Sequence, residues 1–337
     1  MKNSKLPAAI LTFFVLISVN FALAAVWWSG AEGDWSAKTN WDGGKVPPKE
    51  ERAYIDNGGT ATVSDSQFVT TANAGWNASG AIIVAKTGVL NSTGGSINLG
   101  RKAKAIGTLT VDGGTVISGV GLYTGYEGGG GTINVLNGGT ITLTSVLHLG
   151  YSNSAAPHKL TIDGKGSKVV AKSDGNSTVI ARAGSTSAMV EITNGGRLIS
   201  AGDAYTANTA KNTATVLIDG TGSEWKIGKK LYIVNRGTGT LTIQNGGLVS
   251  AKEIFIGEPG SVRMGGGGML AVADGGKPAK TMEDFLQRLV TGSGNIQYWN
   301  GSEWVHISKA VINTDYTLDT FREDSTSYSR LTVTLKR

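Results

Sequence analysis

Aromatic side chains recur at one place in a repeated pattern, between two aliphatic residues, as in LHLG, LYIV and IFIG. A row of aromatic rings on a flat face suits binding of a sugar polymer or docking of a second rod. Large outward side chains can equally serve only to stabilise their cross-strand neighbours. The residues at this place are Asn98, Tyr123, His148, Ile180, Tyr205, Tyr232 and Phe255, and Tyr126 and Tyr151 follow just beyond two of the copies. Our candidate ligand-binding residues are Tyr123, His148, Tyr205, Tyr232, Phe255, Tyr126 and Tyr151.

Three aspartates recur at a turn, where stacked carboxylates could serve acid/base or Ca²⁺ chemistry. They are Asp112, Asp163 and Asp219. Other copies hold Leu, Thr or Gln at that place, and Asp is a common turn former, so we expect a turn role. The histidines have no partner at a spacing typical of metal or triad sites, and we expect surface positions for His148, His158 and His306. We therefore predict no catalytic residue, no metal and no cofactor.

Tryptophan is dense near the start of the chain and scattered further on. These rings could bind carbohydrate. A short cap also needs large apolar groups to close the open end of a core. We expect most of these tryptophans to plug the core rather than to bind carbohydrate. The residues are Trp27, Trp28, Trp35 and Trp41, with Trp76 and Trp225 beyond them.

The elements that position these side chains are copies of one repeat. An apolar residue before a glycine-rich turn recurs at intervals of 24 to 30 residues, at Val84, Val111, Val135, Ile162, Ile192, Ile218 and Ile243. A shortened copy follows at Met264, and an irregular one precedes near Val63. Each copy alternates at period two in three short runs, with Asn, Asp and Gly at turns that need positive φ, which predicts three strands.

Equivalent strands should stack on one another rather than fold back as hairpins. Inward positions match between copies, as in the second-strand column Val116, Ile141, Val169, Leu198, Trp225 and Val249. We therefore predict an all-β fold, a parallel β-helix of about seven or eight coils that is right-handed by the usual preference of parallel crossovers.

A solenoid needs caps at its open ends. We expect an N-terminal cap at residues 25–60, the β-helix at 61–278 and a C-terminal cap at 279–337. Within that cap, residues 281–290 predict a helix that starts at a Thr281–Asp284 capping box. A hairpin turning at Asn300 and Gly301 and a last strand at residues 328–335 should follow it.

Residues 1–24 carry a basic start, an apolar middle and the small-x-small sequence ALA, which predicts a secretory signal peptide and an exported chain. No later segment is apolar enough to span a bilayer. The chain has no cysteine, so packing alone must hold it together. The net charge of +6 is scattered, which disfavours nucleic acid as a partner.

The segments GTGTLTIQNGGLVSAKEIFIG and GTLTVDGGTV…LYTGY resemble the glycine-rich β-solenoid repeat of type V autotransporters and PEP-CTERM proteins of bacteria. The opening WWSGAEGDWSAKTNWDGGKVP and the later IQYWNGSEW are similar to segments of the same proteins. The C-terminal sequence TVTLKR departs from the PEP-CTERM sorting tail. The resemblance implies a bacterial surface protein and specifies no catalytic site.

We therefore expect a non-enzymatic, exported surface or secreted adhesin or scaffold. Its partners would be extracellular polysaccharide, bound through the aromatic column, or other surface proteins. The alternative is a polysaccharide lyase or hydrolase on the same scaffold, although no cluster of acidic and basic residues marks a groove. An ice-binding face would need a more regular threonine ladder than the sequence holds.

Overall fold

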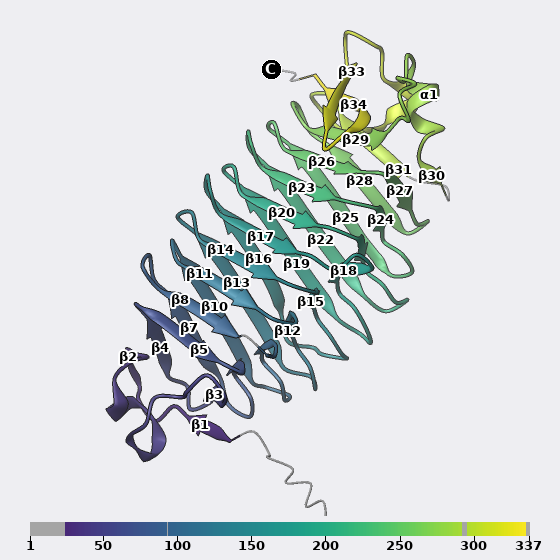
Figure 1. Ribbon diagram of the computed structural model, residues 1–337. Coiled ribbons are helices and arrows are strands. Elements are labelled where there is room, and N and C mark those ends of the chain that lie inside the picture. Colours follow the sequence, from purple (N-terminus) through teal and green to yellow (C-terminus); the bar gives the residue numbers. More distant parts are fainter. Residues whose placement is uncertain (1–23, 93, 292–294, 335–337) are drawn as a thin grey trace, which may run out of the picture.

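The computed structural model describes residues 24–92, 94–291 and 295–334. The predicted signal peptide, residues 1–24, lies outside them except for Ala24. Within the described residues the chain winds into a rod of three long sheets around one core, with the strands of successive turns side by side (Figure 1). The predicted all-β parallel β-helix is confirmed.

The first sheet collects the first strand of each turn. Its order is β2 (Glu32–Asp34), β4 (Thr60–Val63), β7 (Gly80–Val84), β10 (Ile106–Asp112), β13 (Gly130–Leu136), β16 (His158–Asp163), β19 (Ser187–Thr193), β22 (Thr213–Asp219), β25 (Thr238–Gln244), β28 (Gly260–Met264), β31 (Asn295–Trp299) and β32 (Trp304–His306). All neighbours are parallel except β31 and β32, which form an antiparallel hairpin.

The second sheet collects the second strands. Its order is β5 (Ser66–Val69), β8 (Val89–Ser92), β11 (Thr115–Ser118), β14 (Thr140–Leu143), β17 (Lys168–Ala171), β20 (Arg197–Ser200), β23 (Glu224–Ile227), β26 (Leu248–Ala251), β29 (Met269–Ala273), β34 (Thr326–Val333) and β33 (Tyr316–Glu323). The pairs of β34 with β29 and β33 are antiparallel.

The third sheet carries the predicted aromatic column. Its order is β1 (Ala25–Trp27), β3 (Arg52–Ile55), β6 (Thr71–Ala74), β9 (Ile97–Leu99), β12 (Leu122–Thr124), β15 (Leu147–Leu149), β18 (Asn176–Ile180), β21 (Asp203–Thr206), β24 (Lys230–Ile233), β27 (Glu253–Ile256) and β30 (Val290–Thr291). All neighbouring strands of this sheet are parallel.

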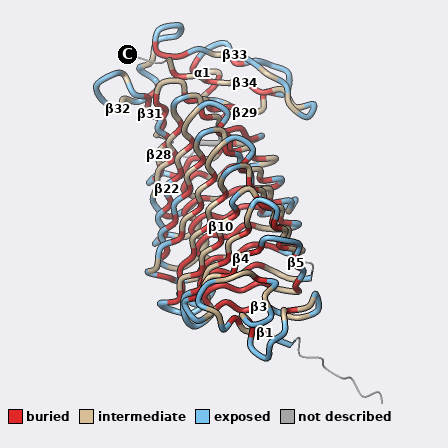
Figure 2. The backbone as a smooth tube through the Cα atoms, turned by 90° about the vertical axis from the view of Figure 1, so that its left-hand side faces the viewer, coloured by how far each residue is buried: buried red, intermediate tan, exposed pale blue. Residues whose placement is uncertain are grey.

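The core is made of stacked aliphatic columns, because alternate residues of each strand point inward. In β10, Leu109 and Val111 are fully buried, whereas Thr108 and Thr110 are half-buried on the outside. Figure 2 shows buried segments running the length of the rod. The first-strand column pairs in register through Val63, Val84, Val111, Val135, Ile162, Ile192, Ile218, Ile243 and Met264.

The second-strand column from Val116 to Val249 also pairs in register, as predicted. Burying each such aliphatic side chain contributes about 1.5–3 kcal/mol, so the columns are the main source of stability. The described residues hold nine complete three-stranded turns rather than the seven or eight predicted. The difference arises because the irregular copy at Val63 and the shortened copy at Met264 each form a full turn.

The N-terminal residues extend two of the sheets. β1 and β2 already pair in parallel with β3 and β4, so the chain adds strands to the third and first sheets from Ala25 onward. Beside them, two 3₁₀ turns, η1 (Lys38–Asn40) and η2 (Asp42–Gly44), hold a cluster of buried indoles. Trp35 and Trp41 meet edge to face at 4.8 Å, and Trp41 donates its indole N–H to the Trp35 carbonyl at 2.7 Å.

Antiparallel strands end the first and second sheets at the C-terminal end. There the helix α1 covers only Met282–Leu286, shorter than the predicted 281–290, because the chain returns to the third sheet as β30. The Thr281–Asp284 capping box is present. A 3₁₀ turn, η3 (Ile307–Lys309), follows the hairpin of β31 and β32, and the last strand is β34 at Thr326–Val333.

Candidate functional site

The outward column of the third sheet is longer than predicted. The rows in register are Trp27, Tyr54, Asn73, Asn98, Tyr123, His148, Val179, Tyr205, Tyr232 and Phe255. The assignment of Ile180 was wrong. A register shift in β18 between Asn176 and Thr178 places Val179 in the column and leaves Ile180 fully buried in the core.

Accessibility varies along this column. Tyr123, Tyr205, Tyr232 and Phe255 are half-buried and reach the surface. His148 is only 8% exposed, so its ring is covered rather than offered to a ligand. The four half-buried aromatic residues are therefore the members of the predicted set that remain open to contact within the column.

A second column follows the third sheet at the corners of five successive turns. Each member comes directly after a residue with positive φ, for example Gly100 at 62° and Ala181 at 54°. We call it the corner ladder, and its members are Trp76, Arg101, Tyr126, Tyr151 and Arg182. Of these five, the sequence predicts Tyr126 and Tyr151 as candidate ligand contacts and Trp76 as a ring that could bind carbohydrate, but neither arginine. Extending each copy past its corner residue reveals the two arginines, Arg101 and Arg182.

The corner ladder combines three aromatic rings with two guanidinium groups. Arg101 lies 3.9 Å from the Trp76 ring centroid and 5.1 Å from that of Tyr126. Tyr126 stacks on Tyr151 with centroids 4.6 Å apart and planes 8° from parallel. Arg182 lies 4.2 Å from the other end of this stack, over Tyr151. Cation–π contacts of this kind contribute about 0.5–2 kcal/mol each.

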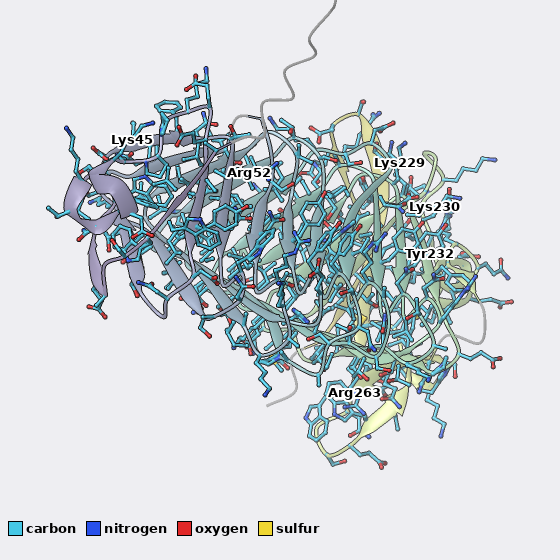
Figure 3. The ribbon with its side chains drawn as sticks, turned by 90° about the horizontal axis from the view of Figure 1, so that it is seen from below. Lys45, Arg52, Lys229, Lys230, Tyr232 and Arg263 are labelled. Carbon is cyan, nitrogen blue, oxygen red and sulfur yellow. The ribbon has the colours of Figure 1, made fainter. Side chains whose placement is uncertain are left out.

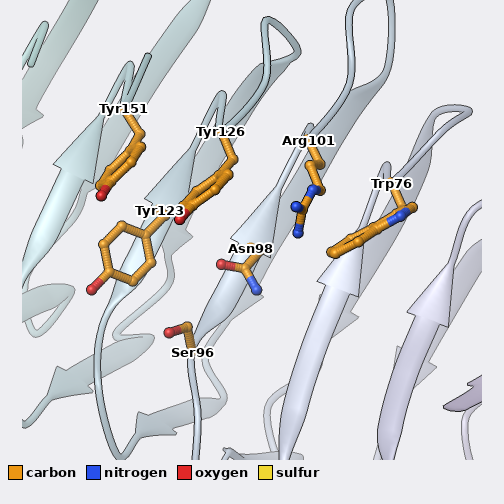
Figure 4. Close-up of a pocket in the computed structure, with 7 residues that line it drawn as sticks. All are labelled: Trp76, Ser96, Asn98, Arg101, Tyr123, Tyr126 and Tyr151. Carbon is orange, nitrogen blue, oxygen red and sulfur yellow. The ribbon is translucent and has the colours of Figure 1, made fainter. Parts of the chain in front are cut away.

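An open cavity of about 290 Å³ lies between the two columns (Figure 4). Indole, guanidinium, amide and hydroxyl groups line it, and none of these described lining residues is a carboxylate or a histidine. The lining residues are Trp76, Ser96, Asn98, Arg101, Tyr123, Tyr126 and Tyr151. We call this the Tyr123 pocket.

Tyr123 differs from its neighbours in the direction of its ring. Its plane is 81° from that of Tyr151 and 78° from that of His148. In Figure 4 its ring is seen face-on, whereas Tyr126 and Tyr151 are seen obliquely. No described ring stacks in parallel on Tyr123, so it can still receive a flat ligand. Burial, followed by the neighbouring Tyr151, raises its pKa, so the phenol stays a neutral hydrogen-bond donor.

The second aromatic patch, Tyr205, Tyr232 and Phe255, is packed differently. Tyr205 and Tyr232 stack with centroids 4.4 Å apart and planes 2° from parallel, so each gives one face to the other. Burial first, and then Asp203, raises the pKa of Tyr205 to about 12. Lys229 and Lys230 lie on the same side of the rod as Tyr232 (Figure 3), and Lys230 pairs with Glu253 at 2.9 Å. This packing favours cross-strand stabilisation at these residues.

The repeated aspartates bind their neighbouring turns. Each accepts a hydrogen bond from an asparagine one turn further along, from Asn137, Asn194 or Asn245, at 2.5, 2.7 and 2.8 Å. Aspartate thus alternates with asparagine, so the three carboxylates Asp112, Asp163 and Asp219 are never on adjacent turns. Among the described residues, no group of three or more His, Asp or Glu is placed to hold a metal ion.

The expectation of surface histidines is wrong for two of the three. His148 is covered, and His158 is 2% exposed with its Nδ1 2.9 Å from the Thr124 hydroxyl. His306 is exposed, and its Nδ1 lies 2.8 Å from the Ser308 hydroxyl. Period-two alternation places His148 on the outer side of its strand, but the alternation does not show that aromatic residues cover that position.

The tryptophans divide into two groups. Trp28, Trp35 and Trp41 are buried near the N-terminal end of the rod, where a plug would lie, whereas Trp225 is buried far from that end in the second-strand column. Trp27 and Trp76 are half-buried on the third sheet, where Trp27 stacks on Tyr54 at 4.3 Å. Trp76 therefore belongs to the candidate site rather than to the cap.

The buried histidines predict acid sensitivity. Burial, and then Arg182, lowers the pKa of His148 from 6.5 to about 3, and burial lowers that of His158 to about 4. Below pH 6.5 the unfolded chain binds protons that the rod does not, so the free energy of unfolding falls as pH falls. We expect His148→Phe to lose less stability than the parent between about pH 7 and about pH 4.5 in denaturant titrations. An equal loss in both proteins would exclude His148 from the acid response.

Comparisons with known proteins add little. No protein-family model and no curated protein matches the sequence. A similar solved structure is the crystal structure of the TibC-catalyzed hyper-glycosylated TibA55-350 fragment, with 18% identity, 83% of this chain and 92% of that chain covered, and a TM-score of 0.25. At that score the likeness carries no argument about this chain. Of the helices in the described part of the chain, none has the length and apolarity needed to cross a membrane.

Proposed function

We propose that this chain is an exported, non-enzymatic β-solenoid that serves as a surface or secreted adhesin or scaffold, and that its Tyr123 pocket binds a saccharide. The observation that carries the proposal is an open cavity that joins one unstacked aromatic ring to several hydrogen-bonding groups. Sugars present both apolar C–H faces and hydroxyl groups, so a site for them needs both kinds of contact. The signal-like residues 1–24 and the resemblance to autotransporter repeats support export to a surface.

The pocket chemistry favours binding over catalysis. General acid–base cleavage of a glycosidic bond typically needs a pair of carboxyl groups about 5–10 Å apart. The described lining residues offer none, and the nearby Glu127 is held by Arg101 at 2.5 Å. Hydrolysis or elimination by a β-helix enzyme is the alternative function that the experiment must detect.

The test is retention of the mature protein on a panel of immobilised acidic and neutral polysaccharides. We expect Tyr123→Ala to weaken retention about tenfold, or about 1.4 kcal/mol, because the ring face is the centre of the contact. Tyr232→Ala is the matched control, since it removes a half-buried tyrosine from the same column outside the pocket.

The outcomes separate the two functions. Retention of the parent and of Tyr232→Ala, with loss in Tyr123→Ala and an unchanged circular-dichroism spectrum, supports the pocket. Equal retention of all three proteins, or no retention of the parent, contradicts it. New reducing ends or unsaturated products in the polysaccharide would identify an enzyme instead.

A further inference from the structure

Positive side chains outnumber carboxylates around the Tyr123 pocket. The corner ladder contributes Arg101 and Arg182, and the loop after Arg101 adds Lys102 and Lys104. Within the described residues of this region the opposing carboxylate is Glu127, which lies beside Lys102 and, with Lys104, lines an adjacent cavity. The pocket therefore lies in a positive local field, which attracts anions.

The two arginines are in different electrostatic states. Arg101 donates from Nε to Glu127 at 2.9 Å and forms an ion pair with it, and this contact lowers the pKa of Glu127. Arg182 gives one N–H to the Tyr151 carbonyl at 3.4 Å, and no ion pair joins it to a carboxylate of the described chain. Its charge is thus free to meet one on a ligand.

Arg182 is close enough to the pocket wall to act on it. Its guanidinium lies over Tyr151, which lines the pocket. Burial raises the pKa of Tyr123, and the positive charge of Arg182 opposes that effect. Burial lowers the pKa of His148, and the charge of Arg182 adds to that effect. Stacking on Tyr151 restricts the guanidinium, so binding an anion there costs less conformational entropy than it would at a freely moving side chain.

A second carboxylate, Asp56, lies at the other end of the corner ladder, the end opposite Arg182. Asp56, beside Trp76 in the neighbouring turns, accepts hydrogen bonds from the backbone N–H groups of Asn77 and Ala78 and from the Asn77 side chain. These hydrogen bonds hold the carboxylate against the loop after Trp76, so Arg182, four turns beyond Trp76 along the ladder, is not paired with it.

We infer that the saccharide bound by this rod is anionic, a uronate-type polymer whose carboxylate pairs with Arg182 while a sugar ring lies against Tyr123. The inference rests on the proposed saccharide function and names its ligand class. A guanidinium offers two parallel N–H donors that match the two oxygens of a carboxylate. Asn98, Ser96 and the tyrosine hydroxyls supply partners for the sugar hydroxyls.

The experiment compares one polymer in two charge states. The probes are a polyuronate, the same polymer fully methyl-esterified, a neutral polysaccharide and a sulfated galactan. The parent protein should bind the polyuronate at least about tenfold more tightly than its methyl ester, and added salt should narrow this gap. Arg182→Gln should bind the acid and the ester with equal affinity. Arg182→Lys should show a preference for the acid that is intermediate between those of the parent and of Arg182→Gln.

Arg263→Gln is the matched control. It removes the same charge from an exposed arginine on β28 of the first sheet, which also lies near an aromatic ring, Trp304, at 5.7 Å. Its affinity for the polyuronate should equal that of the parent. A loss as large as that of Arg182→Gln would attribute the effect to net charge and overturn the assignment.

Each remaining outcome is decisive. If the parent binds the ester as tightly as the acid, the anionic ligand is wrong while the saccharide function stands. If it binds none of the polymers, the proposed function itself fails. Tighter binding of the sulfated galactan than of the polyuronate would overturn the carboxylate assignment, and an unchanged Arg182→Gln would remove this arginine from the site.

Discussion

Trp225→Ala is expected to lower the free energy of unfolding by about 3–5 kcal/mol. Trp225 is fully buried in the second-strand column, where it pairs with Leu198 on one side and Val249 on the other. It is the largest member of a column otherwise made of aliphatic residues. Each turn of the rod contacts only its neighbours, so the surrounding strands have few ways to collapse into the cavity that an alanine leaves.

The indole also ends a buried chain of hydrogen bonds. Its N–H donates to the Ser200 hydroxyl at 3.1 Å, and that hydroxyl lies 2.7 Å from Thr178 Oγ1 of the preceding turn. Truncation therefore leaves a buried hydroxyl with one partner fewer, in addition to the cavity.

Denaturant titration followed by circular dichroism measures this effect. Trp225→Leu is the control for the column, and it should lose less because a leucine already fills the adjacent place at Leu198. Ser200→Ala tests the hydrogen bonds alone, with an expected loss of about 1–3 kcal/mol. A midpoint for Trp225→Ala equal to that of the parent would contradict a closed core at this turn.

The aliphatic columns could be predicted from the sequence because a solenoid converts sequence period into spatial register. Val84 and Val111, 27 residues apart, lie side by side because every copy must bury the same positions. The turns could also be predicted from the sequence, because an Asn before a Gly is typical of positive φ. Asn137 and Asn194 both precede a glycine and both adopt a φ of 53°.

The exposure predicted from the repeat is wrong at two residues, Ile180 and His148, for different reasons. At Ile180 an extra residue in β18 shifted the alternation by one place, and a one-residue shift exchanges inside for outside. At His148 the alternation predicts the correct side of the strand. The rings of Tyr123 and Tyr151 nevertheless cover the imidazole, with ring centroids 5.4 and 5.7 Å from its own. Burial by neighbouring side chains depends on rotamers, which the repeat pattern does not encode.

The candidate site was found only in part, because its residues belong to two columns. Tyr123 lies within a strand and follows period two, so the pattern identifies it. Arg101 and Arg182 follow a corner residue, which is glycine in one turn and alanine in the other. A search for aromatic residues alone passes over the arginines, although the arginines supply the charge that distinguishes one saccharide class from another.

Gly100→Ala is expected to destabilise the rod by about 3 kcal/mol and to disturb the Tyr123 pocket. Gly100 is the corner residue before Arg101 and has a φ of 62°. A Cβ built there would lie 1.6 Å from the carbonyl oxygen of Gly130, which belongs to the backbone of the next turn. Neither group can move without displacing a ladder of parallel strands, so the strain cannot be relieved by a rotamer change.

The matched control is Ala207→Gly at the equivalent corner of a later turn. Ala207 is fully buried at a φ of 43°, so that corner already accommodates a methyl group. Its replacement should change the free energy of unfolding by no more than about 1 kcal/mol, because relief of the left-handed strain offsets the lost packing and the greater entropy of glycine. Denaturant midpoints of the two variants, together with polysaccharide retention by Gly100→Ala, test the argument. If Gly100→Ala were as stable as Ala207→Gly, the corner at Gly100 would not need glycine, and close packing of successive turns would not fix the position of Arg101.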